Sequence, residues 1–233
     1  MYNIGHLKRT FIIIPAFNEK AVIGRVVEDL LPLGFPIIVV DDGSSEDLRT
    51  QVTRENKIIC IRHKVNLGQG AALQTGIDFA LKQEGASWFV TFDADGQHSV
   101  EDIPAMLAPL FMEQADIVLA SRFLTKGSHN APIIKQLILK AGRWVNYIFT
   151  GLYLSDAHNG LRAMNRIAAN SIRITENRMA HATEIVAQIR KHKLRYREIG
   201  ANVLYTPYSK NKGQSSLNSL KIFFDLVLQK LFG

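Results

Sequence analysis

The chain has only one cysteine, Cys60, among its 233 residues. A single cysteine excludes an intramolecular disulfide framework and fits a reducing compartment. Cys60 falls in the apolar run 58–61, where a small buried side chain is the simplest interpretation. Long hydrophobic runs are also lacking, since no uncharged stretch approaches the ~20 apolar residues that a membrane-spanning helix needs. The sequence therefore predicts neither a disulfide-stapled domain nor a membrane-spanning one.

Acidic residues are outnumbered, with 21 Asp and Glu against 28 Lys and Arg, which gives a formal net charge of +7. Most of the excess is local, because the range 190–212 contains seven basic residues and one acidic residue. Such an excess favours an anionic partner, namely nucleic acid, a membrane surface or a phosphorylated ligand. Nucleic acid is the least favoured, since no aromatic platform is interleaved with the basic residues and no recognition motif is present.

Short apolar runs alternate with segments of helical periodicity through the first half of the chain. The runs that predict buried strands are 11–14, 36–40, 58–61, 88–92 and 116–120. Apolar residues at helical spacing predict helices at 21–31, 73–81, 103–111, 135–152 and 217–232. This alternation predicts an α/β fold whose doubly wound, mostly parallel sheet carries helices on both faces. No linker rich in Pro, Gly or Ser divides the chain, so we expect one domain over residues 1–233.

Polar residues gather where the predicted strands end. They occupy 15–19 after the first strand, 41–44 after the second, 93–98 after the fourth, and Ser121 and Arg122 after the fifth. Ligands bind outside the carboxyl ends of the strands in open parallel sheets. A helix cap at Asn18 or a plain turn at 42–44 would explain a single cluster. Three acidic clusters on one rim repel one another, however, and a bound cation would compensate that repulsion.

Asp93, Asp95 and Gln97 form a set of hard oxygen donors after the fourth strand. Such oxygens suit Mg²⁺ or Mn²⁺. In an extended strand, residues two apart lie about 7 Å from each other, which is too far for a tight shared chelate. Either the turn at 95–96 curls the second carboxylate inward, or one aspartate binds the ligand and Asp95 is the stronger metal ligand. The neighbouring His98 is more simply interpreted as a hydrogen-bonding residue.

The segment 66–72 opens the helix after the third strand, and its two glycines, Gly68 and Gly70, permit close backbone approach. It is neither a Walker loop nor a dinucleotide fingerprint, because the Lys-Ser/Thr pair and the third glycine are missing. Taken in order, the motifs resemble those of the family 2 glycosyltransferases, which have the A-type fold with a Rossmann-like nucleotide-binding core. The resemblance is carried by 15–19, 40–44, 66–70, 93–98, 120–123 and 159–162. It extends over residues 10–215 and is strongest to the dolichyl- and polyprenyl-phosphate sugar synthases.

This resemblance implies roles for the matching residues. The nucleotide sugar would be bound by Pro15, Ala16, Phe17, Glu19, Asp41, Asp42, Gly68, Gly70, Asp93, Ala94, Lys210 and Lys212. A Mg²⁺ or Mn²⁺ ion would be held by Asp95 together with Gln97 and Asp93. The catalytic group would be Asp93, Asp95, Arg122 and Arg162, with the two arginines facing phosphates of the donor or the acceptor. The two lysines belong to a basic flap at 209–216 that would close over the diphosphate.

The acceptor is the open question in the chemistry. An alcohol acceptor needs a general base, whereas a phosphate monoester is already largely dianionic at neutral pH. Only Glu184 and Asp156 are candidate bases after the acidic cluster. We therefore expect an inverting transfer of a hexose from a nucleoside-diphosphate sugar to a polyprenyl phosphate. The alternatives are transfer to a sugar hydroxyl in cell-wall or polysaccharide assembly, and a non-catalytic nucleotide-sugar-binding scaffold.

The implied organisation is a nucleotide-sugar-binding core at 8–125, an acceptor-side region with the flap at 126–216, and an amphipathic helix at 217–233. This helix either packs on the domain or lies on a membrane surface. The aromatic stretch 143–149 would extend the same surface. We expect a cytoplasmic protein, peripheral at the inner face of the membrane, that contacts lipid or a membrane-protein partner.

Overall fold

The computed structural model describes residues 4–52, 58–125, 144, 147–148, 150–178 and 180–204. The predicted flap at 209–216 with Lys210 and Lys212, and the terminal helix at 217–233, lie outside these residues, as does most of the helical stretch at 135–152. Their roles stay predictions. No helix within the described ranges is both long and apolar enough to cross a bilayer.

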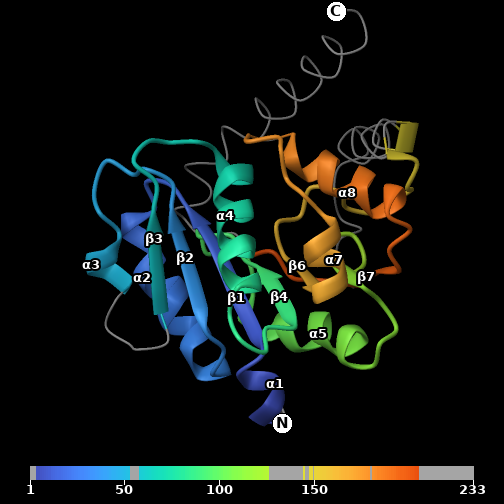
Figure 1. Ribbon diagram of the computed structural model, residues 1–233, viewed down its shortest axis with the longest axis horizontal. Coiled ribbons are helices and arrows are strands. Elements are labelled where there is room, and N and C mark those ends of the chain that lie inside the picture. The colour runs from blue at the N-terminus through green and yellow to red at the C-terminus, as the bar shows by residue number, and fades with distance from the viewer. Residues whose placement is uncertain are drawn as a thin grey trace, which may run out of the picture.

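Within the described residues, seven strands form one sheet (Figure 1) in the order β3-β2-β1-β4-β6-β5-β7. The strands are β1 (Thr10–Ala16), β2 (Ile37–Asp41), β3 (Ile58–Arg62), β4 (Trp88–Thr91), β5 (Ile117–Ser121), β6 (Arg162–Asn165) and β7 (Tyr196–Gly200). β6 runs antiparallel to both of its neighbours, β4 and β5, and the other pairs are parallel. The parallel half brings the carboxyl ends of β1, β2 and β4 to one edge.

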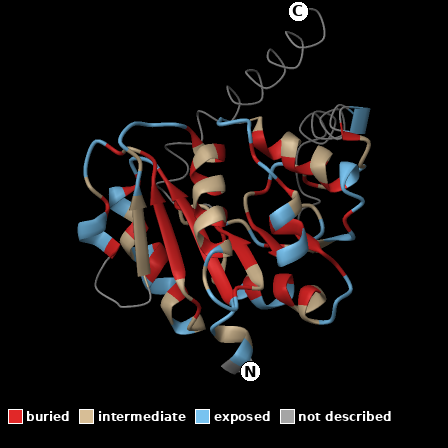
Figure 2. Cartoon of the chain, in the orientation of Figure 1, coloured by how far each residue is buried: buried red, intermediate tan, exposed pale blue. Residues whose placement is uncertain are grey.

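Helices cover both faces of the sheet. The α-helices are α1 (Ile4–Leu7), α2 (Lys20–Leu30), α3 (Arg49–Val52), α4 (Gln69–Leu81), α5 (Ile103–Phe111), α7 (Arg166–Ser171) and α8 (His181–Lys191), with 3₁₀ turns at Leu31–Leu33 and Val100–Asp102. α2 and α5 pack in one core cluster, and α4, α7 and α8 in the other. Strand β1 contributes side chains to both clusters, because Ile12 and Ile14 face the first cluster while Phe11 and Ile13 face the second. Figure 2 shows the central strands buried between helices whose outer surfaces are exposed, with the edge strand β3 less buried.

The α/β fold with a mostly parallel, doubly wound sheet is confirmed, as are the five strands predicted from apolar runs. Two strands were not predicted. β6 begins with Arg162 and ends with Asn165, and β7 is a partly exposed edge strand of sequence YREIG, so neither contains a continuous apolar run. Both strands join the sheet by pairing with β5, β6 on one side of it and β7 on the other. Only the folded chain reveals this pairing.

Candidate active site

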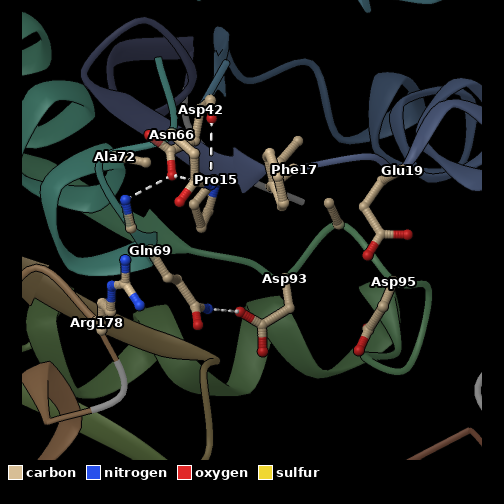
Figure 3. A pocket seen from close by; sticks show the side chains of 13 residues that line it. Pro15, Phe17, Glu19, Asp42, Asn66, Gln69, Ala72, Asp93, Asp95 and Arg178 are labelled. Atoms are coloured by element: carbon tan, nitrogen blue, oxygen red, sulfur yellow. Dashed lines mark hydrogen bonds between the residues drawn. The ribbon is translucent and has the colours of Figure 1, made fainter. Parts of the chain in front are cut away.

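A pocket of about 490 Å³ opens at the carboxyl ends of β1, β2 and β4 (Figure 3). It is lined by Pro15, Ala16, Phe17, Glu19, Asp42, Asn66, Gly68, Gln69, Ala72, Asp93, Ala94, Asp95 and Arg178. The structure thus brings together most of the residues that the sequence motifs nominate. Of the predicted residues that the structure describes, those that do not line this pocket are Asp41, Gly70, Gln97, Arg122 and Arg162.

Asp93 is held in place from two directions. Its Oδ1 accepts a hydrogen bond from Gln69 Nε2 at 3.0 Å, and its Oδ2 accepts one from His98 Nε2 at 2.9 Å. The backbone of Gly160 lies against the carboxylate so closely that a Cβ there would overlap it. Burial alone would raise the pKa of Asp93, but the hydrogen bond from His98 and the charge of Arg162 outweigh it and lower the pKa. Asp93 is therefore a fixed, ionised carboxylate.

Asp95 is less well compensated than Asp93. Its Oδ1 accepts the backbone N–H of Gln97 at 3.0 Å, and no ion pair joins it to a Lys or Arg of the described residues. Burial raises the pKa of Asp95, and the negative charges of Asp93 and Glu19 add to this effect. A divalent cation would remove that repulsion.

The carboxylates of the pocket suit a metal ion whose remaining ligands come from the substrate. No group of three or more His, Cys, Asp or Glu side chains capable of holding a metal occurs in the described part of the chain. Mg²⁺ is usually bound through one or two carboxylates together with substrate phosphates. Asp95, with Asp93 beside it, would hold such an ion. Gln97 contributes its backbone N–H to Asp95, and its side chain does not line the pocket.

Asp42 organises the loop after β3. Its carboxylate accepts hydrogen bonds from His63 Nδ1 (2.7 Å), Asn66 Nδ2 (2.9 Å), the Leu67 amide (3.0 Å) and the Gly68 amide (2.7 Å). Because a carboxylate only accepts, the Nδ1–H of His63 is the donor, and its Nε2 lies 3.0 Å from the Thr75 hydroxyl. The four bonds occupy the accepting positions of the carboxylate, so its role in the structure is to shape the pocket wall. His63 could not be identified from any local pattern in the sequence.

Asp41 lies beneath the pocket. It is fully buried, accepts the backbone N–H of Ser44 at 2.9 Å, and has Arg62 Nε 3.4 Å away. The structure places it as the residue that holds the turn after β2. A direct contact of Asp41 with the nucleotide has no support in this position.

The glycines of the segment 66–72 face another part of the chain. The Gly70 amide donates to the Asn177 carbonyl at 2.9 Å, and a Cβ at Gly68 would overlap that same carbonyl oxygen. A Cβ at Gly70 would overlap the carbonyl oxygen of Glu176. Close backbone approach is therefore real, but the partner is the chain's own segment 176–178. This packing brings Arg178 to the pocket, a residue that no sequence motif had identified.

The two predicted phosphate-facing arginines lie in different environments. The Arg122 guanidinium binds Asp156 in a fork, with Nε to Oδ2 at 2.8 Å and Nη2 to Oδ1 at 2.9 Å. Arg162 is 2 % exposed, and its Nη1 has no hydrogen-bond partner in the described part of the chain. Burial lowers the pKa of Arg162, while the charges of Asp93 and Asp156 oppose that shift. Arg162 is thus a buried cation close to two carboxylates.

Both candidate bases, Asp156 and Glu184, are engaged in hydrogen bonds with other residues of the chain. Burial would raise the pKa of Asp156, but the hydrogen bonds from Arg122 outweigh it and lower the pKa. Glu184, in the first turn of α8, accepts the backbone N–H of Thr175 at 3.0 Å and that of Glu176 at 2.9 Å. Neither carboxylate lines the pocket. Both hold local structure instead of facing a substrate.

The chain is similar to several known proteins. Residues 11–175 match Glycosyl transferase family 2. A UDP-N-acetylglucosamine–dolichyl-phosphate N-acetylglucosaminyltransferase from Methanococcus voltae is 32 % identical and covers 96 % of this chain and 97 % of its own length. A polyprenol monophosphomannose synthase from Mycolicibacterium smegmatis is 28 % identical over 68 % of this chain and 62 % of its own length.

Among solved structures, glucosyl-3-phosphoglycerate synthase from Mycobacterium tuberculosis, in complex with phosphoglyceric acid, superposes with a TM-score of 0.66. It is 17 % identical and covers 92 % of this chain and 81 % of its own, which shows a shared fold. The family match spans most of the chain, including every acidic residue of the pocket. The chain therefore belongs to glycosyl transferase family 2 and is a glycosyltransferase.

Proposed function

We propose that this enzyme transfers a hexose from a nucleoside-diphosphate sugar to a polyprenyl phosphate, with inversion and with the help of Mg²⁺ or Mn²⁺. The observation that carries the proposal is the likeness to the Methanococcus voltae enzyme over nearly the whole of both chains, because that relative is named for transfer to dolichyl phosphate. The pocket supports it chemically. The exposed ring of Phe17 offers a stacking surface for a base, and four carboxylates line the same cavity.

The donor would lie across the sheet edge, with its nucleoside near Pro15 and Phe17 and its diphosphate near Asp93 and Asp95. A divalent ion, when bound, neutralises the charge that develops on the leaving diphosphate. His98 helps to keep Asp93 ionised, and the hydrogen bonds from Gln69 and His98 fix its orientation, so it is prepared to orient the donor. The transfer joins an acceptor oxygen to the anomeric carbon while the bond from that carbon to the diphosphate breaks, which inverts the configuration.

A phosphate acceptor suits the side chains that surround the site. Both candidate bases are engaged, Asp156 by Arg122 and Glu184 by the amides of 175–176. A phosphate monoester has a second pKa of about 6 and needs no base at neutral pH. It needs cations, and the Arg122 side chain, which is 40 % exposed, is better placed to meet it than the buried Arg162.

A polyprenyl phosphate is embedded in a membrane, so the enzyme must reach a lipid surface at its cytoplasmic side. Three exposed aromatic side chains, Trp144, Tyr147 and Tyr153, lie edge to face with ring centroids 6.0–6.3 Å apart. Trp and Tyr favour the membrane–water interface. Arg190 approaches the backbone of Gly151, which places a basic residue next to this aromatic cluster. We propose that this surface makes a peripheral membrane contact.

The test is a panel of UDP- and GDP-hexoses with Mn²⁺ or Mg²⁺ and a short polyprenyl phosphate, scored by release of the nucleoside diphosphate. Release that requires the phosphorylated lipid, fails with the matching polyprenol and stops with EDTA is the expected result. Release that depends on an added saccharide instead of the lipid phosphate would identify a sugar hydroxyl as the acceptor. Binding of a nucleotide sugar without release under any condition would identify a scaffold.

A further inference from the structure

Arg178 differs in charge from every other ionisable residue that lines the pocket. Among the described lining residues it is the only Lys or Arg, whereas Glu19, Asp42, Asp93 and Asp95 are acidic. Its side chain makes no hydrogen bond or ion pair with the described residues. Figure 3 shows the guanidinium beside Gln69, across the pocket from Asp95. A cation that has no partner among the described residues therefore faces an acidic cavity.

The backbone that carries Arg178 is fixed from two sides. On one side the Gly70 amide binds the Asn177 carbonyl, and both glycines of the loop make room for 176–177. On the other side α8 holds the segment, because the amide of His181 (3.1 Å) and its Nδ1 (2.7 Å) both lie against the Arg178 carbonyl.

Glu184 anchors the start of the same segment. It accepts the amides of Thr175 and Glu176, and also the Thr175 hydroxyl. A carboxylate that accepts three hydrogen bonds from one short segment fixes the path of that segment between α7 and α8. These contacts act together with the hydrogen bond from Gly70 to Asn177 and those from His181 to Arg178, which hold the other end of the segment.

We infer that Arg178 binds the diphosphate of the donor, and that Glu184 is the positioning residue for the segment that presents it. The inference rests on the proposed function, because it takes the donor to be a nucleoside diphosphate sugar. The diphosphate brings negative charge into a cavity lined by four carboxylates. A metal ion held by Asp95 would compensate it from one wall, and Arg178 compensates it from the opposite wall. A guanidinium is suited to this task because its planar fork matches phosphate oxygens and stays protonated.

The inference changes the role of two features that the sequence had singled out. Gly68 and Gly70 serve the diphosphate indirectly, by admitting the segment that carries Arg178. Glu184 is then not a general base, although its substitution will lower activity. The two roles differ in their readout, since a lost base lowers the rate of transfer and a lost positioning contact weakens donor binding.

The experiment measures binding of UDP and GDP with Mn²⁺ by calorimetry, and of uridine and guanosine by displacement of the diphosphate. Whichever diphosphate the wild type binds, Arg178→Gln should bind it about 10- to 100-fold more weakly, which is the range for a lost charge-assisted hydrogen bond. Affinity for the matching nucleoside should not change. Arg173→Gln is the matched control, because Arg173 lies on the same stretch but pairs with Asp78 outside the pocket.

Glu184→Gln supplies the second arm. Alone it should weaken diphosphate binding, and added to Arg178→Gln it should cause little further loss, because both changes act through one guanidinium. Equal diphosphate affinity of Arg178→Gln and wild type overturns the inference. So does an equal loss for the nucleoside, which would place Arg178 on the base. A wild type that binds neither diphosphate overturns the proposed function as well, so the two failures are told apart by the wild-type measurement.

Discussion

At the scale of single residues, the acidic side chains of the pocket differ in the hydrogen bonds that they accept. Asp42 accepts four hydrogen bonds and Asp93 accepts two from side chains, whereas Asp95 accepts one from a backbone amide. A well-satisfied carboxylate shapes the site, and a poorly satisfied one is available to a ligand. Asp95 is thus the residue on which a metal requirement should depend.

We predict that Asp95→Asn lowers nucleoside-diphosphate release by about 100-fold or more, because a neutral amide cannot hold the ion that stabilises the leaving group. Titration with Mn²⁺ should show loss of the metal response in this variant. Asp29→Asn, which removes an exposed carboxylate on α2, is the control and should behave as wild type. Full metal-dependent turnover by Asp95→Asn would exclude Asp95 as a ligand.

At the scale of elements, the sequence predicted the strands that are continuous apolar runs, and it predicted where polar residues would follow them. β1 and β2 are buried throughout, so their composition reveals them. β6 contains a buried arginine and ends in asparagine, and its place between β4 and β5 depends on pairing with residues far away in the chain. Local pattern cannot show such pairing.

The same limit applies to the site. Asp93 and Asp95 follow a recognisable strand, so they could be predicted, whereas Arg178 enters the pocket only because two glycines over 100 residues earlier admit its segment. The partners of Asp42 and Glu184 also come from other segments, so their positioning roles had no sequence signal. The lining residues that directly follow strands were predictable, whereas Arg178 and the contacts that hold the lining residues in place were not.

The stability of the fold should also respond to pH through His181, the first residue of α8. Burial, followed by the charge of Arg162, lowers the pKa of His181 to about 4. In the unfolded chain the imidazole titrates near its ordinary value of about 6.5. Between these values the unfolded state binds a proton that the folded state does not, so the free energy of unfolding falls as the pH falls. Below about pH 4 this contribution becomes constant.

We predict a loss of about 2 kcal/mol in the free energy of unfolding between pH 7 and pH 5 from this histidine alone. Urea denaturation at the two pH values measures it. In His181→Gln the difference between the two pH values should shrink by that amount. His192→Gln, which removes an exposed histidine at the end of α8, should retain the wild-type difference. An unchanged pH response in His181→Gln would contradict the assignment.

At the scale of the whole molecule, one aspartate ties together the strands that the sequence did not predict. Asp116, just before β5, accepts hydrogen bonds from Asn165 of β6 (2.9 Å) and from Arg195 (2.8 Å), which precedes β7. The hydrogen bonds from Arg195 lower the pKa of Asp116 to about 2. Its contribution to stability is therefore present above the ordinary pKa of about 4 and is lost as the pH falls towards 2.

We predict that Asp116→Ala lowers the free energy of unfolding at pH 7 by about 2–3 kcal/mol, because it leaves Asn165 and Arg195 without their acceptor. Urea denaturation at pH 7 measures the change. Asp78→Ala, which breaks the exposed pair with Arg173, should cost less than about 1 kcal/mol. Equal effects of the two substitutions would mean that Asp116 does not link the strands.

The net charge of +7 has a distribution that suits a protein approaching an anionic membrane. The acidic residues of the pocket lie at the sheet edge, while Arg190, Lys191 and Lys193 are exposed at the end of α8. Arg195 is neutralised by Asp116, so it contributes little to this surface. The exposed aromatic cluster of Trp144, Tyr147 and Tyr153 adds side chains that favour the interface. Charge would attract the protein, and the aromatic rings would hold it there.

We predict that the protein binds vesicles containing anionic lipid more tightly than neutral vesicles, and that the preference declines as salt is raised, because exposed charges are screened.

Trp144→Ala should weaken binding to anionic vesicles by about tenfold, as expected for an apolar side chain that is partly withdrawn from water. Met112→Ala is the matched control, since Met112 is also exposed but lies beyond α5, away from the cluster. Vesicle co-sedimentation measures all three proteins. If Trp144→Ala and Met112→Ala bind alike, the membrane-facing surface lies elsewhere, and if neutral and anionic vesicles bind alike, the excess positive charge serves another partner.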